Sequence, residues 1–441
     1  MGFAKPLVGF GANGWVSAYK GYQNYIYNSK ETHSEPLKIL VETGFPGLLF
    51  FLLLWLGFLK HWLNSWKTRQ LNRNYLLGVA ALGIGLHSLM DLDLSLSSIF
   101  FTFTLLLASL RANPNEAKYR RLSQIQTSES NTRITALTMN PTKKRLILRS
   151  WITPKRWTVS KSWIIPSIMA PLAFLLILAS PLIITGQSYA EQGKQALNAG
   201  QYAKALNLDQ LAVKYFPYQS SAFEDLALLK MSQGVQTSDQ QLITQALTDM
   251  NRALTLNSSD PIPRSTATRV YSLANQPDLA YRQAQRNLEL ADLYPSGYES
   301  VAKYALLYAE QLILAGKVSE AQPLLRQVLN LSPLIEQRLA RVSEKDKKRW
   351  YTKPHLTVTP RLELYRGEAF ALLGDQENAI KTFTAVSTDE TLKLEALLWK
   401  GSIEKYQGNP QGEFDLINAQ ALNPQIKASF QPLATLLQTI K

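Results

Sequence analysis

Two histidines and two aspartates in the first quarter of the chain are the residues best suited to chemistry. His33 lies in "THSEPLKILVETGFPG", and His87, Asp91 and Asp93 lie in "LHSLMDLDLS". An imidazole can exchange protons at neutral pH, and a carboxylate can orient it. Both stretches adjoin strongly apolar blocks, where ionisable groups are costly and usually mark a site or a pairing. For Asp91 and Asp93, capping of the next helix is an equally good interpretation.

Four apolar blocks must position these residues. Each is about 15 to 23 residues long, against about 20 for a helix that crosses a bilayer. We therefore predict three transmembrane helices within residues 44–110 and a fourth within 162–186. The second block, "NYLLGVAALGIGLHSLMD", is rich in Gly and Ala, which favours close packing among other helices. The blocks are Gly44 to Leu59, Tyr75 to Leu89, Ser95 to Leu110 and Trp163 to Thr185.

The net charge of +14 is concentrated in one segment, which fixes the orientation. Residues 111–161 carry twelve Lys or Arg and two Glu. Nucleic-acid binding is the alternative for such a segment, but between two membrane helices the positive-inside rule favours a cytoplasmic linker. Residues 1–43 and 187–441 then lie outside the cytoplasm, in a multi-pass protein of the cytoplasmic membrane. Because no signal peptide precedes the polar start, we expect Met1 to be an internal start of a longer protein.

A short helix is predicted to carry His33. At about 100° per residue, His33 and Gly44 share one helix face, and Gly47 lies near it, so a neighbouring helix could approach closely. Residues 32–35, with Thr first and Glu last, offer a capping box. Pro46 is expected to bend or restart the helix near the membrane surface.

The region from residue 187 onward is nearly neutral and repetitive. Its first unit, "GQSYAEQGKQALNAGQYAKALNLDQLAVKYFP", resembles a tetratricopeptide repeat, in which small residues let two antiparallel helices approach and Pro stops the second. Several units in tandem predict an α-solenoid, and hence an all-α protein. Its concave surface could bind an acceptor or partner subunit, or the domain could be a structural cap. Recurring positions are Gly193, Gly200, Ala205, Ala212, Pro217, Ala246, Ala253, Ala309, Gly316, Ala321, Pro333, Gly367, Gly374, Ala379, Gly401, Gly408 and Pro424.

Several classes of enzyme are excluded by what the sequence lacks. Without cysteine there is no disulfide framework, thiolate zinc site or cysteine nucleophile. The phosphate-binding G-x-x-x-x-G-K-[ST] loop, the G-x-S-x-G elbow and the H-E-x-x-H metal motif are absent. "GFGANG" at residues 9–14 reads as an irregular loop. We expect no metal, cofactor or nucleic-acid partner.

The stretch "THSEPLKILVETGFPG" resembles the signature of the O-antigen ligase and O-antigen polymerase family, which includes bacterial O-oligosaccharyltransferases. "PLVGFGANGWVSAYKGYQ" is similar to the loop before this signature, and "LHSLMDLDLS" resembles the helix pair after it. A carboxy-terminal repeat domain occurs in several branches. The resemblance covers about residues 1–110, which correspond to the last part of the family's membrane domain.

This resemblance implies glycosyl transfer at the outer face of the cytoplasmic membrane. The donor would be a glycan on a polyprenyl diphosphate, and the acceptor a glycan, lipid or protein. His33 matches the motif histidine, whose expected role is to take or position the acceptor's proton. Supporting roles are assigned to Ser34, Lys38, Glu42, His87, Asp91 and Asp93, and helix packing to Gly44 and Gly47. The family's diphosphate-binding arginines lie in earlier helices, whereas no Arg here precedes Arg69.

Two functions from different classes therefore stay open. The first is a glycosyltransferase, either a ligase or a polymerase, that is complete only when further helices are supplied. The second is a membrane-anchored tetratricopeptide scaffold that binds cell-surface partners and catalyses nothing. Upstream apolar blocks with arginines would favour the first.

Overall fold

The computed structural model describes the chain except for residues 68–72, 92–93, 95, 112–163, 351–354 and 440–441. For residues 164–178 it describes the backbone alone. The described elements are all helices, so the predicted all-α class is confirmed. The predicted cytoplasmic linker and Asp93 lie outside the described residues. The chain divides into two compact units, one with residues 2–12 and 31–179 and the other with residues 13–30 and 180–441.

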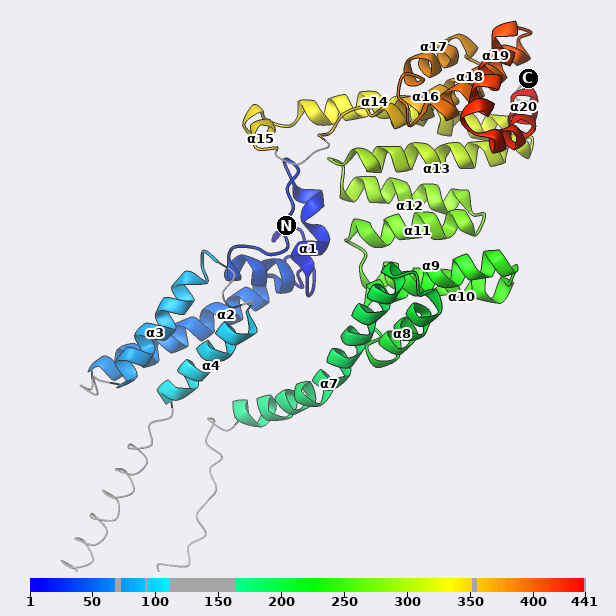
Figure 1. The fold of residues 1–441 in the computed structure, drawn as a ribbon. Coiled ribbons are helices and arrows are strands. Elements are labelled where there is room, and N and C mark those ends of the chain that lie inside the picture. Colours follow the sequence, from blue (N-terminus) through cyan, green and yellow to red (C-terminus); the bar gives the residue numbers. More distant parts are fainter. Residues whose placement is uncertain (68–72, 92–93, 95, 112–163, 351–354, 440–441) are drawn as a thin grey trace, which may run out of the picture. The chain divides into compact units, whose positions relative to one another are not determined.

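Helices occupy all four predicted apolar blocks. In the first unit, α2 (Glu35–Lys67), α3 (Arg73–His87) and α4 (Ser97–Arg111) follow one another (Figure 1). The fourth block forms the start of α7 (Ile164–Asn198). Glycines of α3 receive tryptophans of α2, since a Cβ on Gly85 would collide with Trp55 and one on Gly78 with Trp62. The Gly-rich sequence of α3 thus allows close packing.

Helix α2 is broken at Gly44. This residue has φ 73° and ψ −169°, a conformation open to glycine but strained for other residues. Pro46 contributes to the break because proline cannot donate a backbone hydrogen bond and crowds the preceding turn. The loop at residues 6–11 provides hydrogen-bond partners for backbone groups of α2 on both sides of the break. Phe10 and Gly11 donate their N–H groups to the carbonyls of Val41 and Glu42 at 2.8 and 3.0 Å, and the Pro6 carbonyl accepts from Phe45 at 2.7 Å.

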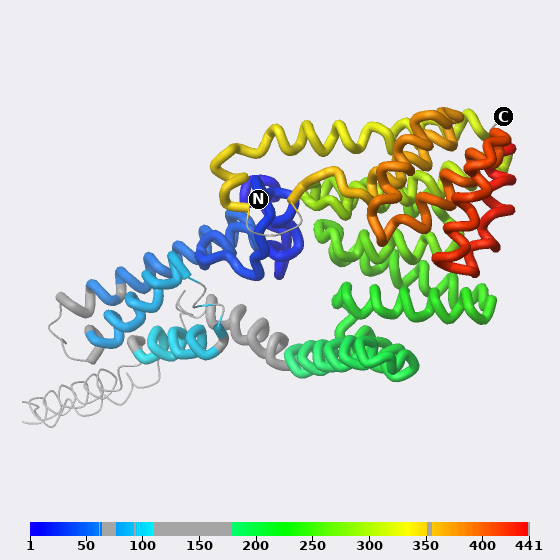
Figure 2. Tube along the Cα trace, turned by 45° about the horizontal axis from the view of Figure 1, so that its top comes forward, coloured from blue at the N-terminus to red at the C-terminus, as the bar shows by residue number. Residues whose placement is uncertain are grey.

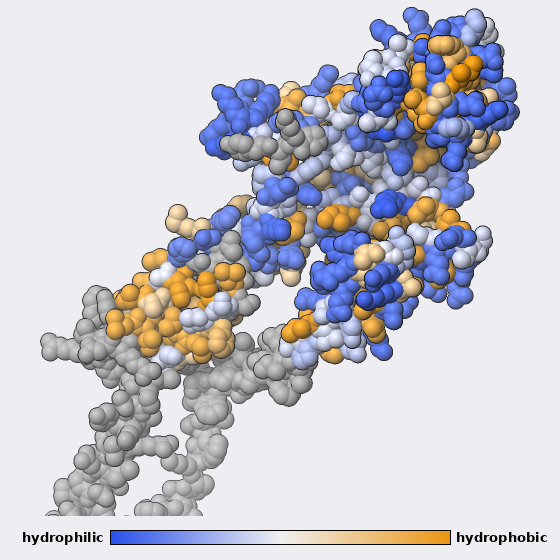
Figure 3. All heavy atoms as spheres, viewed as in Figure 1, coloured by the Kyte–Doolittle hydropathy of each residue, from blue (hydrophilic) through white to orange (hydrophobic). Residues whose placement is uncertain are grey.

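Much of the surface of α2 to α4 is apolar. In the part of the chain that the structure describes, one helix, Glu35–Lys60, is long and apolar enough to cross a membrane, and Leu76–His87 and Ser98–Ser109 are shorter apolar helices. Only 11% of the apolar window of the long helix is buried, unlike the core helix of a soluble protein. A membrane anchor and a signal sequence both fit it. Figure 3 shows the apolar surface over these helices. Four membrane crossings stay a prediction.

The second unit is a stack of antiparallel helices (Figures 1 and 2). Helices pack in successive pairs, α9 with α10, α11 with α12, α13 with α14, α16 with α17 and α18 with α19. Neighbouring pairs share one hydrophobic core from Ala227 to Leu437. The helices are α8 (Tyr202–Tyr215), α9 (Ser220–Thr237), α10 (Gln240–Leu256), α11 (Pro261–Leu273), α12 (Pro277–Leu290), α13 (Pro295–Leu314), α14 (Val318–Ala340), α15 (Glu344–Lys348), α16 (Pro360–Leu372), α17 (Gln376–Val386), α18 (Lys393–Tyr406), α19 (Pro410–Leu422), η6 (Pro424–Ser429) and α20 (Phe430–Thr439).

Small residues and turn glycines set this architecture, and the predicted tetratricopeptide-like solenoid is confirmed. The glycines at four turns, Gly200, Gly316, Gly374 and Gly408, have φ between 72° and 83°, where a side chain would be strained. The predicted alanines are fully buried between helices: Ala205, Ala212, Ala246, Ala253, Ala309, Ala321 and Ala379. The prediction for Pro333 was wrong, because α14 continues through it to Ala340.

Residues 13–30, although they lie near the start of the chain, also belong to this second unit. They contain α1 (Gly14–Ala18) and the short helix η1 (Tyr19–Tyr22), and they pack against repeat helices far away in the sequence. Ile26, only 5% exposed, belongs to the same hydrophobic core as the repeats.

Candidate functional site

The structure brings His33 and Asp91 together. His33 lies just before α2, and Asp91 lies in the turn after α3. His33 Nδ1 is 3.5 Å from Asp91 Oδ1, longer than a hydrogen bond but within the range of an ion pair. The side chains are 76% and 45% exposed, so solvent or a substrate can reach both.

A backbone contact between two helices holds this pair in place. Glu35 donates its N–H to the Ser88 carbonyl at 2.9 Å, which ties the start of α2 to the end of α3. Ser88 is fully buried, and its hydroxyl donates to the Gly85 carbonyl at 2.7 Å. The predicted cap by the Thr32 side chain does not form, because Thr32 Oγ1 donates to the Ser34 carbonyl at 3.0 Å and the Glu35 N–H that it would have accepted is bound to the Ser88 carbonyl.

The polar residues predicted to support His33 lie along the first turns of α2. Lys38 Nζ is 2.8 Å from Glu31 Oε2, so the lysine charge is partly neutralised within the chain. The Ser34 carbonyl accepts the Lys38 N–H at 3.0 Å, and the Glu42 carbonyl binds Gly11. The backbone carbonyls of Ser34 and Glu42 thus accept hydrogen bonds that stabilise this part of the fold.

Of the remaining predicted residues, His87 lies beside the pair, whereas Gly44 and Gly47 lie farther along α2. The His87 carbonyl accepts the N–H groups of Met90 and Asp91 at 2.9 and 3.0 Å, which forms the turn that presents Asp91. Gly44 faces the backbone of Pro6, and a Cβ there would lie 2.5 Å from its carbonyl oxygen. A Cβ on Gly47 would collide with Thr43 of the same helix.

This arrangement has the parts needed for proton transfer. A carboxylate beside Nδ1 of an imidazole can fix its orientation and stabilise its protonated form, while Nε2 exchanges a proton with a hydroxyl. No group of three or more His, Asp or Glu that could hold a metal ion occurs within the described parts of the chain.

The repeat unit has a surface hollow of about 280 Å³ between α12, α13 and α14. Apolar and polar side chains line it, among them Leu288, Leu334, Gln285, Gln327 and Arg341. Leu334 is 44% exposed, so part of the apolar lining is open to a partner.

Two features of the structure had no counterpart in the sequence interpretation. Residues 6–11 cap the break in α2, and residues 19–27 bind the repeats. The second segment, "YKGYQNYIY", has a conspicuous density of tyrosine, which is the one signal that could have singled it out.

No protein-family model matches the chain, and no curated protein matches it. Among solved structures, it is similar to the PilF protein of Pseudomonas aeruginosa, with 13% identity, a TM-score of 0.37, and coverage of 59% of this chain and 100% of that one. For PilW, a widely conserved type IV pilus biogenesis factor, the identity is 18% and the TM-score 0.36, with coverage of 58% of this chain and 97% of that one. For YrrB, a TPR protein with an unusual peptide-binding site, the identity is 18% and the TM-score 0.29, with coverage of 49% of this chain and 92% of that one. Because these TM-scores are low, the repeat assignment rests on the helix pairs of this chain.

Proposed function

We propose that this protein is a membrane-attached scaffold whose helical repeats bind a protein partner. The observation that carries the proposal is the tetratricopeptide-like solenoid, with its partly apolar hollow between α12, α13 and α14. Surfaces of this type recognise extended or helical segments of other proteins by apolar pockets flanked by polar groups.

Site-specific photo-crosslinking in membranes of the native host tests this function. A photoreactive residue replaces Leu334, which lines the hollow, and in a control chain Leu273, which is 45% exposed and does not line it. The scaffold function predicts a discrete protein adduct at position 334 that Arg341→Glu weakens. Identical adducts from both positions, or none at 334, would contradict it.

We further propose that the apolar unit lies in the cytoplasmic membrane, with α2, α3, α4 and α7 as four crossings. Support comes from the exposed apolar side chains of α2 and α4, which would be costly in water and favourable in lipid. They include Leu49, Phe50, Leu53, Leu56, Phe100, Phe101 and Leu105, each at least 50% exposed.

A second function, glycosyl transfer, is favoured by one specific observation. His33 precedes α2 and Asp91 follows α3, yet their ionisable groups lie 3.5 Å apart beside an apolar helix. In this function His33 takes the proton of an acceptor hydroxyl as it attacks a glycan on a polyprenyl diphosphate, and the diphosphate departs with the bonding electrons. The cations that stabilise the diphosphate would come from further helices.

The test uses a chain completed by such helices, in membranes that hold the lipid-linked donor. His33→Ala should abolish transfer, and Asp91→Asn should slow it by about 10²-fold or more, typical of the loss of a general base's partner. Membrane insertion should persist in both. Transfer by the His33→Ala chain at the normal rate would eliminate this function.

A further inference from the structure

The surface formed by α11, α12 and α13 holds a segment of the same chain. Three contacts of different chemistry fix it. Lys20 Nζ lies 5.4 Å from the ring centroid of Tyr294, the Tyr294 hydroxyl donates to Gln23 Oε1 at 3.2 Å, and Ile26 enters the apolar core. A cation on an aromatic face, a side-chain amide and an aliphatic anchor are the elements of peptide recognition.

Glycine at position 21 allows a close approach to the repeats. A Cβ there would lie 3.2 Å from the carbonyl oxygen of Leu290 at the end of α12, which is tighter than ordinary contact, so a side chain at this position would require the segment or α12 to shift. The segment thus matches the surface at four successive points, from Lys20 to Ile26.

The segment also has its own internal order. Trp15 stacks on Tyr19 at 5.9 Å, Tyr19 contacts Tyr27 at 5.8 Å, and the Gln23 side chain donates to the Tyr27 carbonyl. Such local aromatic packing lowers the entropy lost on docking, as in a preorganised ligand.

The fit leaves one part of the surface unfilled. A hollow of about 200 Å³ lies beside the segment, lined by Lys20, Ile262, Ser265, Asn287, Tyr294 and Ser296 among others. Within the described residues, Asn287 Oδ1 is buried there without a hydrogen-bond donor. A buried acceptor without a donor costs free energy, so a ligand that brings a donor into this hollow would gain a hydrogen bond that the internal segment does not make.

We propose that the α11 to α13 surface is a peptide-binding site of the repeats, and that residues 19–27 of the same chain are its built-in ligand. The proposal rests on the scaffold function. An external protein segment with the same order of features, a cation, a small residue, an amide and an aliphatic residue, would compete with the internal one. Binding of a partner would then release the stretch of chain that leads into His33.

A labelled peptide of residues 13–30 tests the proposal on the full chain in nanodiscs. The internal segment competes at a high effective concentration, so the native chain should bind the peptide weakly. Gln23→Ala combined with Ile26→Ala should free the surface and tighten peptide binding at least about tenfold. Val16→Ala, at a residue that is 36% exposed and lies outside residues 19–27, should bind like the native chain. A peptide with Gly21→Val should lose binding.

Hydrogen exchange tests the same proposal in the native chain, so the result does not depend on whether a variant folds. In the native chain, excess unlabelled peptide should speed exchange of the amides of residues 19–27 while those of α12 and α13 stay protected. Equal peptide binding by the native and Gln23→Ala/Ile26→Ala chains, or unchanged exchange under excess peptide, would overturn the proposal. Adducts at position 334 would still support the scaffold function, so the two proposals can fail separately.

Discussion

At the scale of single residues, pairing decides which ionisable groups the fold tolerates. The side chains of His33 and Asp91 are 76% and 45% exposed and can be reached from outside their unit. Asp209 and Asp415, the partner of Lys400, are buried in the repeats, where an unpaired charge is expensive. The first pair is therefore suited to chemistry, whereas the buried groups should control stability.

Asp209 should make the repeat unit less stable at high pH. It is fully buried against Gly193, and both carboxyl oxygens lack a hydrogen-bond partner in the described structure. Burial, with a smaller effect of Asp225, raises the pKa of Asp209 from 3.8 to about 7. The folded state thus holds the proton more tightly than the unfolded state. Its contribution to stability is complete below about pH 4 and is lost as pH rises through 7.

Thermal unfolding of Asp209→Asn between pH 5 and 8 measures this effect. The native chain should melt at a lower temperature at pH 8 than at pH 5, and the variant should show a smaller difference. Glu336→Gln, at an exposed position, should keep the native pH dependence. An unchanged pH dependence in Asp209→Asn would show that this carboxyl does not titrate as described.

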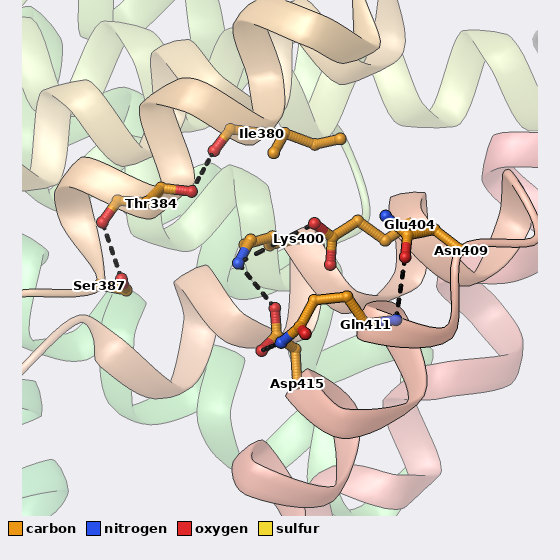
Figure 4. A network of polar contacts seen from close by, with 8 residues as sticks. All are labelled: Ile380, Thr384, Ser387, Lys400, Glu404, Asn409, Gln411 and Asp415. Carbon is orange, nitrogen blue, oxygen red and sulfur yellow. Dashed lines mark hydrogen bonds and ion pairs between the residues drawn. The ribbon is translucent and has the colours of Figure 1, made fainter.

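Lys400 should be essential for the last helix pair. Figure 4 shows it between Glu404 and Asp415, whose carboxylates lie 3.9 and 2.9 Å from its ammonium group and are almost completely buried. Lys400→Met leaves two buried carboxylates without a cation, which should cost about 3–5 kcal/mol of unfolding free energy. The exposed pair of Lys393 and Glu390 provides the control, and Lys393→Met should cost less than about 1 kcal/mol.

Denaturant unfolding measures both variants. Adding Glu404→Gln and Asp415→Asn to Lys400→Met should restore most of the loss, because no buried charge then remains. Equal losses in Lys400→Met and Lys393→Met would mean that the buried ion pairs contribute no more than an exposed one.

At the scale of elements, the break in α2 depends on one glycine. Alanine at position 44 would be strained at φ 73° and would meet the Pro6 carbonyl at 2.5 Å. Gly44→Ala should therefore loosen residues 6–11 and speed hydrogen exchange at Phe10, Gly11 and Phe45. Gly57→Ala, in the same helix with open space around its Cβ position, should leave these amides unchanged. Slow exchange in Gly44→Ala would show that the loop does not depend on the break.

At the scale of the whole molecule, the contact between residues 13–30 and the repeats has a topological consequence. In the proposed arrangement with four membrane crossings, both lie on the same side of the membrane, and the basic linker predicts that side to be outside the cytoplasm. Protease added outside intact spheroplasts should therefore degrade the repeats and leave the membrane helices. Protection of the repeats, with cleavage after permeabilisation, would reverse the predicted orientation.

The amino-acid sequence by itself determined the features that depend on local spacing. The apolar blocks predicted four helices, and the spacing of turn glycines and small residues predicted the repeat. These succeed because helix formation and the pairing of adjacent helices are decided by residues within one repeat length. The glycosyltransferase family remains a resemblance that supports a proposal.

Only the tertiary structure decided the contacts between distant segments. The cap of residues 6–11 on α2, the bond from Glu35 to the Ser88 carbonyl, and the docking of residues 19–27 on α11 to α13 all join parts of the chain whose proximity no local pattern encodes. Pro333 shows the same limit, since α14 continues to Ala340 where a local rule predicted an end. Packing against neighbouring elements can outweigh the local preference of a residue, and it exists only once the chain has folded.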